Sequence, residues 1–442
     1  MILFRIIYIW KDKHIMKKFS FIHCGDLHLG CQQFNEPERF FDFMNSFNYI
    51  VEYAAAKKVN YFLIAGDLFH HRNINASTLG LTMDILRKLK EAGIETIAIE
   101  GNHDKAFYVD EESWMSFLNR QGYFKLLKPY YENGKLKLLP YDGNKGNYIK
   151  RDGLIITGLG YLGATTWQRL EEVFPEFDTH EDFSVLLLHA AVDKLIGMDM
   201  AGVRKESLEK FHDRVDYIAL GHIHSRQETD GFIYNPGAPE SVHIDEVRKN
   251  QEKGFYHVIV ENGEKNVEFI PSTRRKICYF NINLSAIKKP DEAVLKVIHE
   301  LSEFDFEEYD RPLVQVNLFG NIPFNSFAID INDIVEKVRS SCSCLAVEVL
   351  NNTNISQDST LGDITSFDRK SVERSVISQM IGESRPDLLC MEEELVNLIL
   401  NIRDWSLSGV DDKEIVNEIE RLIDMVSLAE AAASKEEETN EN

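Results

Sequence analysis

Six short runs of apolar residues recur along the chain after about residue 18. Each run is four or five residues long and mostly β-branched, aromatic or aliphatic. Such near-continuous apolar runs are typical of strands that are buried on both faces of a sheet. The runs are 19–23, 61–65, 96–100, 154–158, 185–189 and 217–220.

Two longer segments between these runs have the period of an amphipathic helix. Residues 37–57 and 76–92 place apolar side chains three or four positions apart. Asn75 or Ser77 can cap the start of the second helix, and Gly93 can end it. Strands that alternate with helices predict an α/β layered domain, which we expect to cover 18–271.

The pattern changes after Pro271. A small α+β unit is expected over 272–350, followed by a linker and helix over 351–385 and by two short amphipathic helices over 386–430. Within these units the strands are expected at 277–284 and 312–319, and the helices at 290–303, 327–340, 363–383, 388–402 and 415–426. Residues 431–442 are acidic and poor in apolar side chains, which predicts a disordered tail.

The composition is typical of a folded protein, since 44% of the 442 residues are hydrophobic and 27% are charged. Residues 386–442 hold 16 acidic and 4 basic residues, so about half of the net charge of −23 lies in this last segment. A negative chain does not favour nucleic acid as a partner. The mild charge of the remainder still leaves room for a local basic groove.

Cysteine usage and the first residues bear on the compartment. Six scattered cysteines predict reduced thiols in the cytoplasm, and Cys342-Ser343-Cys344 lacks the second half of a zinc site. The apolar stretch 2–10 is too short to cross a bilayer. We expect 1–17 to be an upstream extension, and the choice between Met1 and Met16 as the true start stays open.

Five polar clusters directly follow predicted strands. They are Gly25-Asp26-Leu27-His28, Gly66-Asp67, Gly101-Asn102-His103-Asp104, His189 and Gly221-His222-Ile223-His224. The carboxyl ends of strands are where ligands collect in open α/β sheets. Carboxylate, imidazole and amide groups are ligands for divalent metals. A single Gly-Asp or His-x-His is more often a turn or a surface feature, but five such pieces in order predict a metal site.

The number of ligands predicts the number of ions. Seven side chains are too many for one four- to six-coordinate ion: Asp26, His28, Asp67, Asn102, His189, His222 and His224. If Asp67 bridges, two ions can each receive four protein ligands and act together on a phosphoryl group. His103 then remains as a proton donor to the leaving oxygen, with Asp104 expected to orient it.

The order of these motifs resembles that of the calcineurin-like metallophosphoesterases. The stretches 23–30, 66–70 and 234–240, followed by Lys253-Gly254-Phe255, are similar to the SbcD family of DNA double-strand-break repair nucleases. The resemblance implies an α/β fold, a four-layer β-sandwich flanked by helices, with a small α+β capping domain and a C-terminal helical segment. The chain departs from the family's common Gly-Ser at Gly237-Ala238, which leaves the role of that loop open.

The resemblance also implies a cofactor and site roles. Two Mn²⁺ ions per chain are expected, one held by Asp26, His28, Asp67 and His224 and the other by Asp67, Asn102, His189 and His222. His70 corresponds to a groove histidine that handles substrate, although it could equally be a residue at a helix entry. DNA contacts are expected from Arg274, Arg275 and Lys276 in the capping domain, unless this short basic run is only a solvated face.

The implied function is a manganese-dependent DNA nuclease subunit, with 3′–5′ exonuclease and endonuclease activity, in an SbcCD-like complex that processes double-strand DNA ends. Its partner would be an SMC-like ATPase of the SbcC type, bound through 386–430. The two helices could alternatively pack on this chain, and a homodimer stays open. Two rival hypotheses are a phosphatase or phosphodiesterase for small substrates and a non-catalytic adaptor that recruits an ATPase.

Overall fold

The computed structural model describes residues 18–106, 112–151, 153–177, 182–192, 202–243, 246, 252–355, 374, 377–378 and 392–408. The chain divides into two compact units, 1–356 and 357–442, and each is described here by itself. The predicted extension 1–17, the stripe at 415–426 and the tail 431–442 lie outside the described residues. Within the described part, no helix combines the length and the apolar character that crossing a membrane requires.

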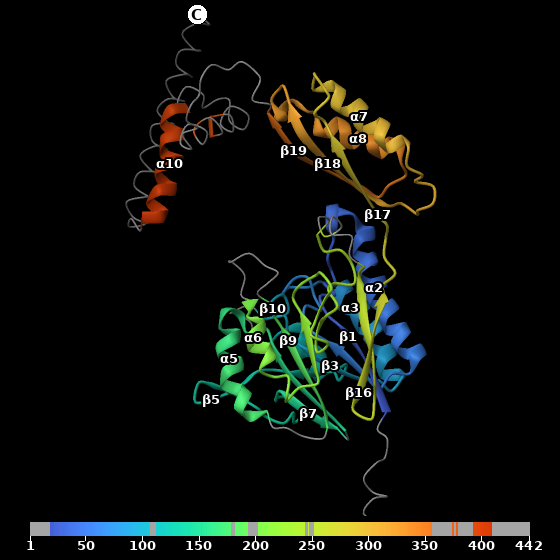
Figure 1. Cartoon of the computed structure of the whole chain (residues 1–442), viewed down its shortest axis with the longest axis vertical. Helices are drawn as coiled ribbons and strands as arrows, with labels where there is room; N and C mark the ends of the chain where they lie inside the picture. Colours follow the sequence, from blue (N-terminus) through green and yellow to red (C-terminus); the bar gives the residue numbers. More distant parts are fainter. Residues whose placement is uncertain are drawn as a thin grey trace, which may run out of the picture. The chain divides into compact units, whose positions relative to one another are not determined.

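The first unit contains two six-stranded sheets (Figure 1). The first sheet has the order β16-β15-β1-β2-β3-β4, in which β1 to β4 are parallel and β15 is antiparallel to both of its neighbours. Its strands are β1 (Lys18–Cys24), β2 (Tyr61–Ile64), β3 (Glu95–Ile99), β4 (Lys125–Leu127), β15 (Gly254–Glu261) and β16 (Glu264–Pro271).

The second sheet has the order β13-β14-β12-β9-β8-β7. Its four central strands are parallel and both edge strands are antiparallel. The strands are β7 (Tyr148–Arg151), β8 (Leu154–Gly160), β9 (Phe183–His189), β12 (Tyr217–Gly221), β13 (Gln227–Thr229) and β14 (Ile233–Asn235). Short two-stranded ladders join β5 (Tyr130–Glu132) to β6 (Lys135–Lys137) and β10 (Ala191–Val192) to β11 (Gly202–Val203).

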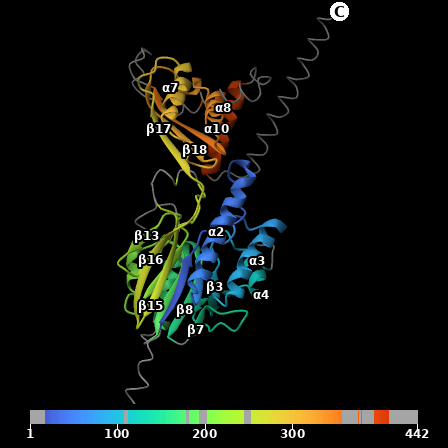
Figure 2. The same ribbon diagram turned by 90° about the vertical axis from the view of Figure 1, so that its right-hand side faces the viewer.

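The two sheets pack face to face between two layers of helices, which confirms the predicted four-layer α/β fold. Phe21 and Leu63 of the first sheet and Val185 and Leu187 of the second share the central core. On the outer face of the first sheet lie α2 (Pro37–Lys57), α3 (Ala76–Glu91) and α4 (Trp114–Arg120) (Figure 2). The second sheet is covered by α5 (Thr166–Val173) and α6 (Lys205–Glu209).

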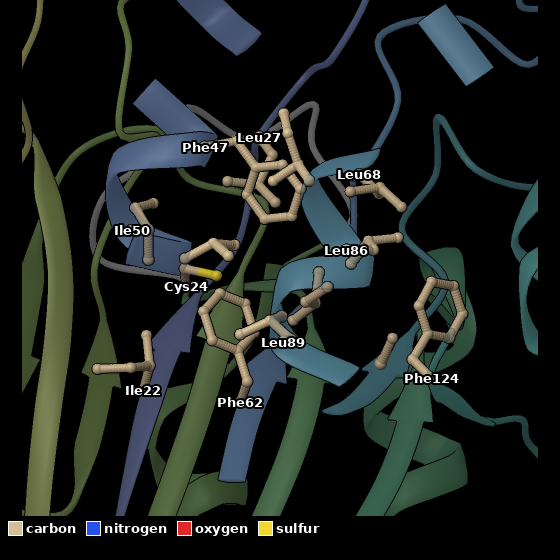
Figure 3. Packing of buried hydrophobic residues seen from close by; sticks show 14 of the residues in the cluster. Ile22, Cys24, Leu27, Phe47, Ile50, Phe62, Leu68, Leu86, Leu89 and Phe124 are labelled. Carbon is tan, nitrogen blue, oxygen red and sulfur yellow. The ribbon is translucent and has the colours of Figure 1, made fainter. Parts of the chain in front are cut away.

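The first helical layer packs because α2 and α3 present one apolar face to the sheet. Phe47 and Ile50 of α2, and Leu86 and Leu89 of α3, are buried against Phe62 of β2 (Figure 3). The start of α3 is capped by Asn75, one of the two predicted caps, whose side chain accepts a hydrogen bond from the amide of Thr78 at 2.8 Å.

All six strands predicted for this domain are confirmed, but ten other strands in its described residues were not predicted. The missed strands are either short, as β4, β7, β13 and β14 are, or belong to the hairpin of β15 and β16. In β16 partly buried and exposed residues largely alternate, because this strand lies at the edge of the sheet. Edge and antiparallel strands lack the continuous apolar run that marks a strand buried on both faces.

The small α+β unit has its own core, formed by α7 (Asp291–Ser302) and α8 (Ile331–Ser341) on one face of a parallel three-stranded sheet. The strands are β17 (Ile277–Asn283), β18 (Leu313–Ile322) and β19 (Ala346–Ile355). The prediction missed β19, and its expectation of a linker from residue 351 is wrong for 351–355. The strand was not recognised because it contains many polar residues, which are tolerated there since β19 is the edge of its sheet.

The second unit is described at α10 (Glu392–Ser408) and at the helical residues 374 and 377–378. The predicted helices at 388–402 and 363–383 overlap these residues. Among the described side chains of α10, Val396 is buried. Leu395 and Leu398 of the predicted stripe are only half-buried.

Arg39 offers a test of how α2 is held to the rest of the domain. Its guanidinium is fully buried and donates to Gln33, to Asp42 at 2.7 Å and to Glu240 at 3.3 Å. Replacing one partner of a buried ion pair leaves the other charge uncompensated, so Arg39→Met should lower the free energy of unfolding by about 3–5 kcal/mol. Urea unfolding measures this loss. Arg87→Met, which removes an exposed ion pair with Asp84, should cost little. Equal losses in the two variants would contradict the prediction.

Candidate metal centre

The predicted ligands lie where parallel strands of both sheets end. Asp26 and His28 follow β1, Asp67 follows β2 and Asn102 follows β3 in the first sheet. His189 is the last residue of β9 in the second sheet, and His222 and His224 follow β12. Because the two sheets pack face to face with these ends together, five segments distant in the sequence supply one site.

The backbone at four of the seven positions is left-handed. The φ angles are 51° at Asp26, 46° at His28, 51° at Asp67 and 97° at His222. Such conformations are unfavourable for residues other than glycine and cluster at functional sites, where the surrounding structure maintains them. Here the amide of Asp26 donates to the Gly66 carbonyl at 3.0 Å, so neighbouring loops hold each other.

The side chains form two neighbouring groups. Ligand atoms of Asp26, His28 and His224 lie within 4.8 Å of one another. The ring nitrogens Nε2 of His28 and His224 are 3.0 Å apart and point to the same space. The first group therefore offers one carboxylate and two imidazoles to a common centre.

The second group contains Asp67, His189 and His222, whose ligand atoms also lie within 4.8 Å of one another. Oδ1 of Asn102 joins it at 3.2 Å from Nε2 of His189. Oδ2 of Asp67 is 3.3 Å from Nε2 of His189 and 3.9 Å from Nε2 of His28 in the first group. Asp67 thus lies between the two groups, in the place that a bridging ligand needs.

The electrostatics of these groups suit a cation. Burial would raise the pKa of Asp67, but the charge of His189 outweighs it and holds the pKa below its usual value. Burial would lower the pKa of His189, yet the same pairing raises it to about 9. Burial lowers the pKa of His28 well below its usual value and that of His222 to about 4, so both rings are neutral at pH 7. Neutral imidazoles beside buried carboxylates are a donor set that fits a divalent metal.

Two glycines allow the loops to approach this closely. A Cβ on Gly101 would lie 2.0 Å from Oδ1 of Asp67, and a Cβ on Gly221 would lie 2.2 Å from the Ala65 carbonyl oxygen. The clusters therefore begin with glycine mainly for space. The left-handed turns themselves are made by Asp26, Asp67 and His222, together with Gly66.

His103 lies beside the first group, with its ring 5.0 Å from that of His28. Its Nδ1 is 2.7 Å from the carbonyl oxygen of His70, so this nitrogen carries the proton and Nε2 is left for other partners. The prediction that Asp104 orients His103 is wrong. The Asp104 carboxylate is buried and instead accepts backbone amides of Leu68, Phe69 and Gly101, because loops with left-handed turns leave these donors unpaired.

His70 is part of the same histidine cluster. Its Nδ1 is 3.4 Å from Nδ1 of His28, and its ring stacks on that of His103 at 5.8 Å. Burial and the neighbouring His71 lower the pKa of His70 to about 4. The structure thus places His70 beside the candidate metal centre, although its role in substrate handling stays a prediction.

The three residues predicted to contact DNA differ in their surroundings. Arg274 and Lys276 are exposed. Arg275 is not available to DNA in the described structure, because its guanidinium binds both oxygens of Asp42 on α2, at 2.7 and 2.9 Å, and its side chain is only 13% exposed. An arginine next to a domain boundary can serve as a link between domains, and sequence alone does not separate that role from phosphate binding.

Two residues that contact the predicted metal ligands were not predicted from the sequence. Tyr161 places its ring 5.6 Å from that of His222, and Glu246 lies 2.7 Å from Nδ1 of His224. Tyr161 directly follows β8 but carries no carboxylate, imidazole or amide group, and Glu246 does not follow a strand, so the ligand pattern indicated neither residue. Ala238, the departure from the family pattern, donates its backbone amide to the His224 carbonyl at 3.2 Å, a contact that needs no serine side chain.

Comparisons with known proteins agree with this architecture. Residues 19–226 match the family model described as calcineurin-like phosphoesterase. The chain is 30% identical over 241 residues to the DNA double-strand break repair protein Mre11 of Archaeoglobus fulgidus, covering 52% of each chain. It is 24% identical over 417 residues to the protein of that name from Saccharolobus solfataricus, covering 92% of this chain and 99% of the relative.

Residues 19–226 thus have the fold of the calcineurin-like phosphoesterases, and the similar archaeal proteins carry the name of a DNA repair protein. The alignment spans about half of the Archaeoglobus protein and nearly all of the Saccharolobus one. The predicted calcineurin-like metallophosphoesterase fold is thereby confirmed. The narrower SbcD assignment, the identity and number of the metal ions and the partner stay predictions.

The close approach at Gly101 can be tested directly. Gly101→Ala should push the Asp67 carboxylate out of place and weaken manganese binding by on the order of 10- to 100-fold, the usual effect of disturbing the supports of a metal ligand. Gly80→Ala is a matched control, because a Cβ on Gly80 in α3 meets no atom within 4 Å. Calorimetric titration of both variants gives the measurement. Normal manganese affinity in Gly101→Ala would show that the centre tolerates this displacement.

Proposed function

We propose that this chain is a manganese-dependent DNA nuclease subunit of an SbcCD-like complex, with 3′–5′ exonuclease and endonuclease activity in DNA double-strand-break processing. The observation that carries the proposal is the pair of ligand groups that share Asp67 at the strand ends. The names of the similar archaeal proteins support double-strand-break repair as the process. A nuclease of cellular DNA would work in the cytoplasm of a cell without a nucleus.

The two groups would hold two ions. Asp26, His28, Asp67 and His224 would bind one, and Asp67, Asn102, His189 and His222 the other. When bound, two such ions supply Lewis-acid activation of the phosphodiester and of the attacking water. The chain itself fixes the ligands through the loop contacts of Asp26 and Asp67 and through the hydrogen bond from His189 Nδ1 to the Ala65 carbonyl at 2.7 Å.

His103 is the proposed acid of the reaction. Its Nδ1–H donates to the His70 carbonyl, which fixes the ring, and a ring that is also protonated at Nε2 can pass that second proton to the leaving oxygen and become neutral. Arg274 and Lys276, both exposed, are proposed to contact phosphates of the bound duplex. His70, in the cluster beside His28, is proposed to position the substrate strand.

The first test is metal binding together with nuclease activity. The intact chain should bind two manganese ions, measured by calorimetry, and should degrade end-labelled linear duplex DNA when manganese is present. Asp67→Ala should disturb both ions because Asp67 lies between the groups, whereas His28→Ala should disturb mainly one. Cleavage of a small phosphodiester without any action on DNA would favour the small-substrate enzyme instead. Binding of a single ion would overturn the two-metal account.

The second test separates His103 from the ligands. His103→Gln should bind manganese and DNA nearly normally and lose on the order of 10²–10⁴ in cleavage rate, because only proton donation is removed. His212→Gln, at an exposed position outside the site, should cleave at the normal rate. Loss of a manganese ion from His103→Gln would make this residue a ligand and contradict the assignment.

The partner proposal concerns 386–430. Its described helix α10 carries one buried apolar residue, Val396, and an apolar residue, Ile399, that is 43% exposed. We expect such a segment to dock on an SMC-like ATPase. A chain truncated before Pro386 should still cleave a small phosphodiester with manganese but should no longer co-purify with a co-expressed ATPase of this type. Full recovery of the ATPase with the truncated chain would show that the segment is not the docking site.

A further inference from the structure

His224 is held at its ring and at its main chain by two residues outside the predicted ligand set. Nδ1 of the ring is 2.7 Å from Oε1 of Glu246. The other carboxylate oxygen of Glu246 accepts from the ammonium group of Lys253. The same ammonium group also donates to the His224 carbonyl oxygen at 2.8 Å. Lys253 thus fixes both the residue that orients the ring and the backbone that carries it.

The pair is shielded from solvent and anchored on the first sheet. The side chains of Lys253 and Glu246 are 3% and 11% exposed. Lys253 directly precedes β15, and its carbonyl accepts the amide of Ser272, just after β16, at 2.8 Å. The ammonium group therefore projects from the paired ends of the β15–β16 hairpin. A lysine so deeply buried requires its acidic partner.

The carboxylate determines which nitrogen of His224 faces the centre. An acceptor at Nδ1 keeps the proton on that atom and leaves the lone pair on Nε2, which lies 3.0 Å from Nε2 of His28. A carboxylate in this position also makes an imidazole ligand more basic. In the second group, Nδ1 of His189 is oriented instead by the backbone carbonyl of Ala65 at 2.7 Å, and the carboxylate of Asp26 lies farther from it, at 4.0 Å.

We propose that Glu246 and Lys253 act as a positioning pair for His224 and set the affinity of the group formed by Asp26, His28 and His224 for its divalent cation. The inference rests on the proposed function only in requiring that this group binds a metal. Lys253 acts on His224 in two ways, through the Glu246 carboxylate and through its own bond to the His224 carbonyl. The second group, oriented by backbone atoms, is independent of the pair.

The test is manganese titration of Glu246→Gln by calorimetry, with electron paramagnetic resonance of the bound ions. We expect the dissociation constant of one ion to rise by on the order of 10- to 100-fold while the other stays unchanged. Correspondingly, a spectrum of single manganese ions should replace that of a coupled pair. Lys253→Met should act in the same direction. The double variant should lose less affinity than the sum of the two single losses, because both residues hold His224 in part through the same carboxylate.

Glu261→Gln is the matched control, since it removes an exposed carboxylate paired with a lysine at the far end of β15. It should leave both constants unchanged. Unchanged binding of both ions in Glu246→Gln would overturn the proposal. So would an equal loss of both ions with a lower melting temperature of the metal-free protein, which would indicate a general structural role. Failure of the intact chain to bind two ions would overturn the proposed metal centre itself, and the role of the pair with it.

Discussion

The close approach of strand ends from two packed sheets is the constraint on which the site depends. Asp67 follows the first sheet and His189 ends a strand of the second, yet their side chains lie 3.3 Å apart. Backbones can come this near only where side chains are absent, and Gly101 provides that space beside Asp67. Sheet packing therefore fixes the site geometry, and rigid strands hold each ligand close to its working position.

This arrangement concentrates unfavourable features in one place. Four ligand positions have left-handed backbones, and Asp26 and Asp67 are buried carboxylates whose nearby positive charge is mainly that of His189. The apolar cores between and outside the sheets must compensate for this cost. A cation that binds only the folded chain would stabilise it and so offset part of this cost.

A chain of charged contacts connects the small α+β unit to the main domain. Arg275 precedes β17 and binds Asp42 on α2, which also accepts from Arg39. Phe34 packs against Ile277, Leu313 and other apolar residues of the small unit. A basic residue that sequence analysis assigns to DNA binding thus joins two parts of the chain, since its nearest anions belong to the protein itself.

The sequence by itself determined the central strands, the main helices and the polar residues that gather at the strand ends, because strands buried on both faces and potential chelating residues after them leave clear local patterns. It did not determine edge strands such as β19, whose polar residues resemble a linker. Contacts between distant segments were decided only by the tertiary structure. Asp104 accepts backbone amides, Arg275 donates to Asp42, and Glu246 pairs with the ring of His224. Hydrogen-bond partners far apart in the chain depend on how the layers pack, and no local pattern encodes that.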